Sequence, residues 1–398
     1  MFSRWFIIQT RMSDLMSNPS ALFYSQFCEE HQGEMLSALR QMVELESPSD
    51  NKDALDRCGA YLAREFARRG GKVSMHRQEY AGDHLKAEFP GRAGAKPILL
   101  LGHFDTVWPL GTLEKMPFRV DDARAYGPGV LDMKAGIVMM LFAMRALRSA
   151  NEGNHRPVTV LLDTDEEIGS ATGRPVVEAE ARGCEAVLVL EPAQTVEGRL
   201  KTSRKGVGTY RLRVRGRAAH AGVDFDKGRS AILELSRQVL EIAKFTDLAR
   251  GITVNPGVIH GGTRTNVIAA EAVAEVDVRI TRPSDAQELE QKFKALRPFD
   301  PECALEVSGG VNRPPMERGE GTVRLFRAAQ GEGKKLGMTL EEAATGGGSD
   351  GNFTSALGIP TLDGLGAVGE AAHAAGESIL LKELPRRTAL LACLIESL

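Results

Sequence analysis

The chain has 398 residues, which is enough for a large hydrophobic core and for two or three domains. Hydrophobic residues make up 42% and charged residues 26%, and the formal net charge is -3. This balance gives no support for a nucleic-acid partner, which would need a concentrated basic face. No stretch reaches the ~20 apolar residues of a membrane-spanning helix. We therefore expect neither a nucleic-acid nor a membrane partner.

The five cysteines are scattered without a CxxC pair, which is typical of reduced thiols in a reducing compartment. Near the N-terminus, residues 5–8 form an apolar patch, but four apolar residues are too few for the core of a signal peptide. Met12 is a second possible start. The expected location is cytoplasmic.

The first part of the chain predicts alternating helices and strands. Apolar residues at spacings of three and four predict helices over 32–46 and 53–69. Two short strands are expected near Val73 and Leu85. The uninterrupted apolar run that follows, 98–101, is typical of a strand buried on both faces of a parallel sheet.

Four strand-like runs each end in residues that can bind a metal. The run 98–101 leads to His103 and Asp105, and later runs lead to the other candidates. Ligands bind beyond the carboxyl ends of the strands in such sheets, so we expect one convergent site. The runs and the residues that follow them are 98–102 with His103 and Asp105, 158–162 with Asp165, Glu166 and Glu167, 186–190 with Glu191, and 359–362 with His373.

A strongly apolar helix is predicted over 133–150, after a loop rich in glycine and proline. Asp132 stands at its start. An aspartate there is most often a helix N-cap, and the alternative is a metal ligand held by the helix terminus.

The middle of the chain has a different character. Strands are expected near 210–214, 253–260, 272–280 and 304–308. Of these, 210–214 and 272–280 alternate apolar and polar residues, as strands with one wet face do. Two amphipathic helices lie between them, which gives the order β-α-β-β-α-β of a ferredoxin-like unit. We expect a domain inserted at 205–313 between two parts of an α/β catalytic domain, 1–204 and 314–398. The second part is expected to hold a helix over 321–336, a glycine-rich loop over 345–351 and a final helix near 384–397.

The candidate residues form a nitrogen and oxygen ligand set for two metal ions. The set is His103, Asp132, Glu167, Glu191 and His373. Zinc takes imidazole and carboxylate ligands, and two zinc ions that share a bridging carboxylate can clamp a hydroxide. Neighbouring side chains in an extended segment point to opposite sides, so one of Glu166 and Glu167 could bind metal while the other faces the substrate as general base. Asp105 is placed to orient the imidazole of His103.

These motifs, in this order, resemble the di-zinc aminoacylase and carboxypeptidase family, and the likeness covers the chain from about residue 32. That family includes glutamate carboxypeptidase, acetylornithine deacetylase and succinyl-diaminopimelate desuccinylase. The segments that carry the likeness are 103–107, 129–136, 165–170, 191–192 and His373. Local spacing around 127–132 and 345–350 looks closest to the glutamate carboxypeptidase branch.

The resemblance implies a role for each residue at the expected site. Asp132 would bridge two Zn²⁺ ions, with Co²⁺ or Mn²⁺ as alternatives. His103 and Glu191 would complete one metal site, and Glu167 and His373 the other. Glu166 would be the base. Relatives often have a cis peptide bond after the bridging aspartate.

The resemblance also assigns residues outside the metal ligands. His220 would polarise the scissile carbonyl, in its own or a partner subunit, and Asn266 would contact substrate. Arg279 would grip the free carboxylate of the substrate, since a guanidinium binds carboxylates bidentately. Gly347, Gly348 and Ser349 could line the same pocket. Residues 218–219 and 268–270 depart from the family pattern, which affects specificity.

The predicted activity is hydrolysis of an amide bond beside a free carboxylate, by attack of metal-bound hydroxide. The first expectation is a carboxypeptidase that releases a residue such as glutamate from a small peptide or an N-acyl amino acid. The alternative is an N-acyl-amino-acid deacylase. The inserted domain of the family implies a homodimer.

Two alternative functions from other classes of protein remain open. Residues 347–351 fit the motif G-x-S-x-G of serine hydrolases, with Asp363 and His373 in the order that the triad needs. That motif requires a strand before Ser349, and 341–345 is a poor one. The other reading is a non-catalytic interaction protein on a metal-binding scaffold, against which the presence of Glu166 argues.

Overall fold

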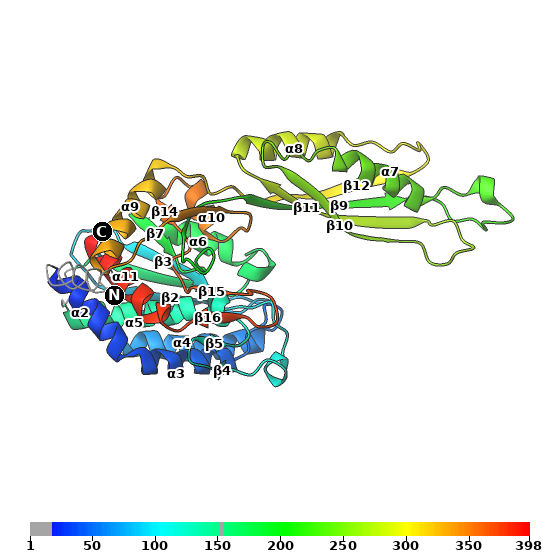
Figure 1. Ribbon diagram of the computed structural model, residues 1–398. Helices are drawn as coiled ribbons and strands as arrows, with labels where there is room; N and C mark the ends of the chain where they lie inside the picture. The colour runs from blue at the N-terminus through cyan, green and yellow to red at the C-terminus, as the bar shows by residue number, and fades with distance from the viewer. Residues whose placement is uncertain (1–17, 151–154) are drawn as a thin grey trace, which may run out of the picture. The chain divides into compact units, whose positions relative to one another are not determined.

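A computed structural model describes residues 18–150 and 155–398 (Figure 1). The apolar patch at 5–8 and Met12 lie outside the described residues. The chain divides into two compact units. The first comprises Met1–Ser203, Arg318–Thr345 and Ser349–Leu398, and the second comprises Arg204–Glu317 with Gly346–Gly348. The second unit therefore begins and ends within a few residues of the expected bounds 205 and 313, and it also includes part of the glycine-rich loop.

The first unit is built on a six-stranded sheet of order β1-β2-β6-β3-β7-β14. β6, β3, β7 and β14 run parallel, while β2 pairs antiparallel with both β1 and β6. The sheet is thus mostly parallel, as the sequence predicts. Its strands are β1 (Lys72–His76), β2 (His84–Phe89), β3 (Ile98–His103), β6 (Val158–Asp163), β7 (Ala186–Val189) and β14 (Thr361–Leu362).

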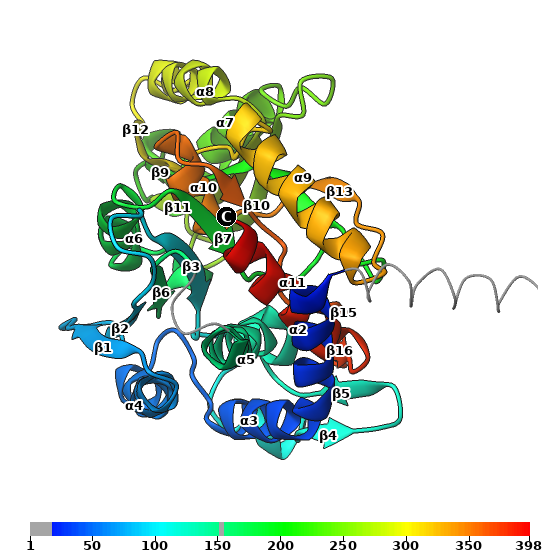
Figure 2. The ribbon, with the colours of Figure 1, turned by 90° about the vertical axis from the view of Figure 1, so that its left-hand side faces the viewer.

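Helices cover both faces of this sheet (Figures 1 and 2). Alternate residues of β3 enter different cores: Ile98 and Leu100 join the core that contains α5 and α11, whereas Leu99 and Leu101 pack with residues of α6. Burial on both faces explains the continuous apolar run. The helices of this unit are α2 (Pro19–Glu30), α3 (Gln32–Glu44), α4 (Lys52–Arg68), α5 (Ala135–Ala150), α6 (Gly173–Ala181), α9 (Glu320–Lys335), α10 (Gly351–Ala356) and α11 (Glu383–Ser397).

Two small sheets complete the first unit. One has the order β15-β16-β5-β4, and the other pairs β13 with β8. The expectation that 341–345 is a poor strand is wrong, because Glu342–Thr345 pairs as β13. The strands are β4 (Arg119–Val120), β5 (Arg124–Tyr126), β8 (Leu200–Arg204), β13 (Glu342–Thr345), β15 (Gly369–Glu370) and β16 (Ser378–Leu380).

The second unit has the expected β-α-β-β-α-β order. Its four strands form an antiparallel sheet of order β10-β11-β9-β12, the arrangement of a ferredoxin-like domain. Buried residues of β9 and β11 pack with residues of α7 and α8 in a separate core. The elements are β9 (Gly206–Arg215), α7 (Ala231–Ala243), β10 (Thr253–Gly261), β11 (Glu271–Ile280), α8 (Pro283–Ala295) and β12 (Ala304–Arg313).

No helix in the described ranges, 18–150 and 155–398, is both long enough and apolar enough to cross a membrane.

Candidate metal centre

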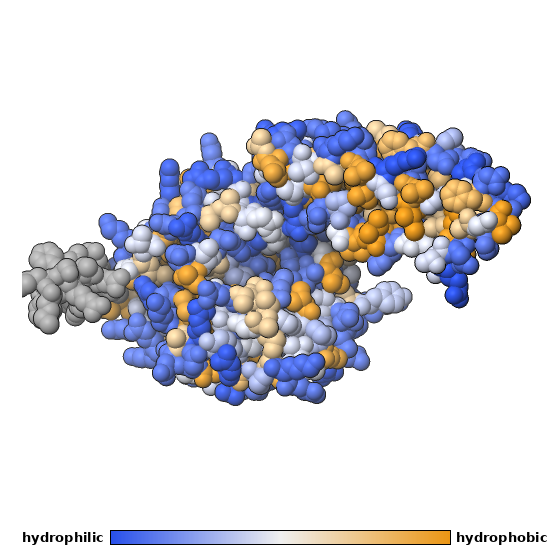
Figure 3. Space-filling view, turned by 45° about the vertical axis from the view of Figure 1, so that its right-hand side comes forward, coloured by the Kyte–Doolittle hydropathy of each residue, from blue (hydrophilic) through white to orange (hydrophobic). Residues whose placement is uncertain are grey.

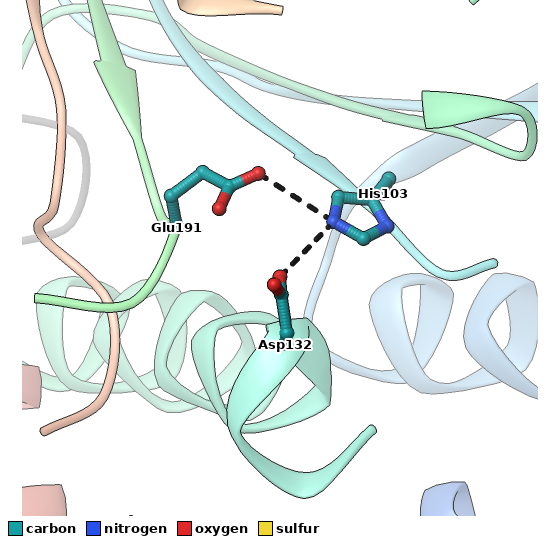
Figure 4. Close-up of side chains that lie close together, drawn as sticks. All are labelled: His103, Asp132 and Glu191. Atoms are coloured by element: carbon teal, nitrogen blue, oxygen red, sulfur yellow. Dashed lines mark ion pairs between the residues drawn. The ribbon is translucent and has the colours of Figure 1, made fainter. Parts of the chain in front are cut away.

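Five predicted ligands of the first unit meet as two groups that share Asp132. In the first group, His103 Nε2 lies 3.4 Å from Asp132 Oδ1 and 3.5 Å from Glu191 Oε1. Figure 4 shows these three side chains pointing toward one another. In the second group, His373 Nε2 lies 3.2 Å from Asp132 Oδ2 and 3.1 Å from Glu167 Oε1. Each oxygen of Asp132 therefore faces a different histidine, as a bridging carboxylate requires.

Strand ends deliver several of these ligands to one place. His103 is the last residue of β3, Glu167 follows β6, and Glu191 follows β7. These three strands are parallel neighbours, so their carboxyl ends lie at the same edge of the sheet. The three side chains thus lie at the strand ends from which the sequence argument started.

Asp132 lies in a turn, Val130–Lys134, that precedes α5. The helix thus begins at Ala135, two residues later than predicted, and Asp132 is not its N-cap. The peptide bond between Asp132 and Met133 is cis, as the resemblance implies. Gly129, just before the turn, has φ of 70°, a conformation that glycine adopts without strain.

Asp105 connects two of the ligand-bearing segments. Its Oδ1 lies 3.2 Å from His103 Nδ1, and its two oxygens accept hydrogen bonds from the backbone N–H groups of Glu166 and Glu167. Ser49 donates to Oδ2 at 2.7 Å. This carboxylate can orient the imidazole as predicted, and it also fixes the turn that presents Glu166 and Glu167.

The turn that holds Glu166 and Glu167 differs from the expected extended segment. Residues Glu166–Ile168 form a short 3-10 helix, so the argument that neighbouring side chains alternate does not apply. Glu167 reaches His373, while the backbone N–H of Glu166 is bound to Asp105 Oδ1 at 3.3 Å.

The pKa values of the ligand side chains show that acidic groups and imidazoles interact strongly at this site. Burial lowers the pKa of His103, but the carboxylates of Asp105, Asp132 and Glu191 raise it well above the ordinary value. Asp132 and Glu167 raise the pKa of His373 to about 11. Burial opposes ionisation of Asp132, yet the two histidines hold its pKa far below the usual range. Protonated imidazoles thus compensate the acidic charge, and metal ions held by His103, Asp132 and His373 would supply that positive charge instead.

Three buried ligand atoms face other ligands of the site but make no hydrogen bond within the described residues, which fits the coordination of metal ions. In the described part of the chain, His103 Nε2, Asp132 Oδ1 and Glu167 Oε1 are buried and have no hydrogen-bond partner. Burying such atoms unpaired is costly, and coordination of a cation would satisfy all three. Imidazole nitrogen and carboxylate oxygen are ligands that zinc accepts.

The remaining predicted site residues lie in the second unit or at its border. His220 and Asn266 are exposed neighbours there, since the N–H of Ala221 donates to the carbonyl of Asn266 at 3.0 Å. Arg279 lies on β11, where its Nε and Nη2 donate to the carboxylate of Asp277 and its Nη1 to the carbonyl of Gly346. One edge of this guanidinium is therefore already occupied.

The glycine-rich segment contributes to both units. Gly347 and Gly348 belong to the second unit, and the guanidinium of Arg204 donates to both of their carbonyls. Ser349 belongs to the first unit and is 0% exposed. Its hydroxyl donates to Asp363 Oδ2 at 2.6 Å. A buried hydroxyl that donates to an aspartate is not a serine nucleophile, which needs a histidine acceptor and access to substrate.

Two residues that position the ligands were missed by sequence reasoning. Glu377 is fully buried and accepts hydrogen bonds from the backbone around Asp132. Gly136 lies against the carbonyl of Leu190, the residue before Glu191. Gly136 belongs to the quoted segment 129–136, so its place in that motif was the available signal. Glu377 had only its spacing of four residues from His373.

The model of peptidase family M20/M25/M40 matches residues 99–397. The chain belongs to this family. It is 31% identical to carboxypeptidase G2 from Pseudomonas sp. strain RS-16 over 381 residues, which covers 94% of this chain and 91% of that protein. It is 30% identical to succinyl-diaminopimelate desuccinylase from Dechloromonas aromatica, covering 77% of this chain and 85% of that protein.

Solved structures share the fold. The YXEP protein from Bacillus subtilis, described as a dinuclear metal-binding peptidase of family M20, superposes with a TM-score of 0.65 at 14% identity, covering 93% of this chain and 98% of that chain. Membership of this family, together with the 31% identity to a carboxypeptidase, makes the protein a metal-dependent hydrolytic enzyme of the carboxypeptidase-like M20 group.

Proposed function

We propose that this enzyme is a di-zinc carboxypeptidase, which releases a C-terminal amino acid such as glutamate from an N-acyl or peptide substrate. The observation that carries the proposal is Asp132, whose two oxygens face two separate histidine and carboxylate groups. The relative at 31% identity is named a carboxypeptidase, which supports the choice of bond.

The residues of the first unit supply the proton transfers. Two bound zinc ions would polarise the scissile carbonyl and lower the pKa of the attacking water. Glu166 accepts a proton from that water and delivers it to the leaving amine, as a general base and then acid. Asp105 keeps Glu166 in place through its backbone N–H and holds the His103 imidazole in one orientation.

The second unit supplies substrate recognition. Arg279 binds the free carboxylate through the N–H groups of Nη1 and Nη2 other than those bound to the Gly346 carbonyl and to Asp277. His220 stabilises the developing oxyanion, an interaction typically worth ~2.7–4 kcal/mol of barrier. Asn266, Gly347 and Gly348 contact the substrate backbone. Ser349, which is buried, acts by holding Asp363 rather than by touching substrate.

The second candidate function is deacylation of an N-acyl amino acid, favoured by the 30% identity to a desuccinylase. Both reactions cleave an amide beside a free carboxylate, so the same residues serve either. Two series of substrates distinguish the reactions: one varies the acyl group and keeps glutamate, and the other varies the terminal residue and keeps the acyl group. A carboxypeptidase is selective for the terminal residue, whereas a deacylase is selective for the acyl group.

The decisive test compares an N-acyl-glutamate with its C-terminally amidated twin, using zinc-loaded protein. We expect a strong preference for the free acid. Equal rates would contradict the role of Arg279, and no hydrolysis of either would contradict the proposed substrate class. Glu166→Gln should retain both zinc ions and lose turnover. Loss of zinc in that variant would show that Glu166 is a ligand instead of the base.

The proposed assembly is a homodimer formed through the second unit. β10 is an edge strand, and its Val258 and Ile259 are exposed, as are Leu233 and Leu240 of the neighbouring helix α7. Figure 3 shows hydrophobic residues on the surface of this unit. Exposed apolar side chains beside an unpaired strand edge favour pairing with a second copy. Light scattering should give twice the chain mass, and Ile259→Lys should give the monomer mass. A monomeric wild type would contradict the proposal.

A further inference from the structure

Glu377 is a buried carboxylate that binds the loop carrying Asp132. It lies four residues beyond His373, immediately before β16, and is 0% exposed. Its Oε1 accepts hydrogen bonds from the N–H groups of Leu131 at 2.8 Å and Asp132 at 3.1 Å. Its Oε2 accepts from the N–H of Gly129 at 2.9 Å and from Trp108 Nε1 at 2.8 Å. Each oxygen thus faces two donors.

An arrangement of four N–H donors selects an anion at this position. Charge-assisted hydrogen bonds of this kind are roughly twice as strong as neutral ones. Burial raises the pKa of Glu377, and its N–H donors act in the opposite direction. A glutamine would place an NH₂ group against two of the four donors, so no rotation of its amide satisfies the set.

Backbone contacts join the same two segments. β16 pairs with β5, and the N–H of Gly127, just beyond β5, donates to the carbonyl of Glu377 at 3.3 Å. The turn that carries His373 is compact, since the N–H of Glu377 donates to the carbonyl of Ala374. The loops of Asp132 and His373 therefore share Glu377 as a common support.

We propose that Glu377 is a positioning residue that fixes Asp132 and His373 relative to each other, and thereby sets the affinity of the metal site that these two residues share with Glu167. This inference rests on the proposed two-zinc centre. Glu377 touches neither metal nor substrate in this scheme. It acts through the backbone of one ligand and through the turn of the other.

The test is zinc titration of the metal-free, full-length protein against a competing chelator. Glu377→Gln should bind at least one of the two zinc ions 10–100-fold less tightly, the usual effect of removing a residue that orients metal ligands. The matched control is Glu234→Gln. Glu234 is 1% exposed in the second unit and accepts hydrogen bonds from Gln238 and from the N–H groups of Phe299 and Asp300. It should bind zinc as the wild type does.

Trp108→Phe provides a second variant if Glu377→Gln does not fold. It removes one side-chain donor and leaves the carboxylate, so we expect zinc affinity to fall by a few-fold. Wild-type zinc affinity in every variant that folds would overturn the inference. A wild-type protein that binds fewer than two zinc ions would instead contradict the proposed function, so the two failures are distinguishable.

Discussion

Adding one methyl group at Gly136 should disable the metal centre without touching any ligand. A Cβ atom at Gly136 would lie 2.2 Å from the carbonyl oxygen of Leu190. Carbon and carbonyl oxygen normally approach no closer than ~3.3 Å, so Gly136→Ala requires a shift of about 1 Å. The residue after Leu190 is the predicted ligand Glu191, and Asp132 lies four residues before Gly136.

The Leu190 carbonyl cannot simply move away. Gly366 also packs against this oxygen, since a Cβ there would be 2.1 Å from it, and the N–H of Leu190 is bound to the carbonyl of Leu101 at 3.0 Å. The shift must therefore be taken by α5 with Asp132 or by the end of β7 with Glu191. A displacement of 1 Å at a catalytic centre can cost 100-fold in rate. That corresponds to about 2.7 kcal/mol of barrier.

The assay is kcat/KM for the preferred amide substrate together with zinc content, at a temperature where circular dichroism shows the variant folded. Gly331→Ala is the matched control. Gly331 lies in α9 with no atom within 4 Å of the added Cβ, so alanine should leave activity unchanged and stabilise the helix slightly. Wild-type kcat/KM and zinc content in Gly136→Ala would refute this reasoning.

Three further outcomes are expected. Arg279→Ala should raise KM for free-acid substrates at least tenfold and leave amidated analogues unaffected; an equal effect on both would contradict carboxylate binding. Arg387 is buried and donates to three backbone carbonyls, so Arg387→Ala should lower the free energy of unfolding by about 3 kcal/mol, whereas the partly exposed Arg386→Ala should have little effect in denaturant titration. All five cysteines are buried, and burial raises the pKa of Cys184 to about 11, so a thiol reagent at pH 8 should label them only after denaturation; rapid labelling of the native protein would contradict this.

The features predicted best from the sequence are those that depend on residues close together in the chain. Buried parallel strands are recognisable in the sequence as apolar runs. The rule that ligands bind at the carboxyl ends of such strands was then enough to predict His103 and Glu191, which follow two of these runs. The alternating strands of the second unit could also be predicted, because one face of that sheet is exposed to solvent and its residues are polar. The 3-10 turn at Glu166 could not be predicted. Three residues are too few to show a periodicity that distinguishes a turn from an extended segment.

What the sequence did not predict depends on contacts between distant segments. The strand at Glu342–Thr345 exists because β8 pairs with it, and its own residues are poor strand formers, so tertiary pairing overrides propensity there. Ser349 matched a nucleophile motif, yet its neighbours bury it against Asp363. A motif specifies residue types in order, whereas exposure is decided by the rest of the fold.

The residues that hold the metal ligands in place are hidden from sequence reasoning for a related reason. Gly136 matters because a carbonyl 54 positions away passes close to it, and Glu377 matters because backbone N–H groups about 245 positions away point at it. A backbone carbonyl or N–H group is the same in almost every residue. The residue types in the sequence therefore do not reveal which backbone group Gly136 or Glu377 contacts. A homologous chain with all five ligands but without Gly136 or Glu377 would therefore keep the chemical signature of this site and lose its geometry. Ligand motifs alone are for that reason a test of family membership, and activity must be judged from the residues that support them.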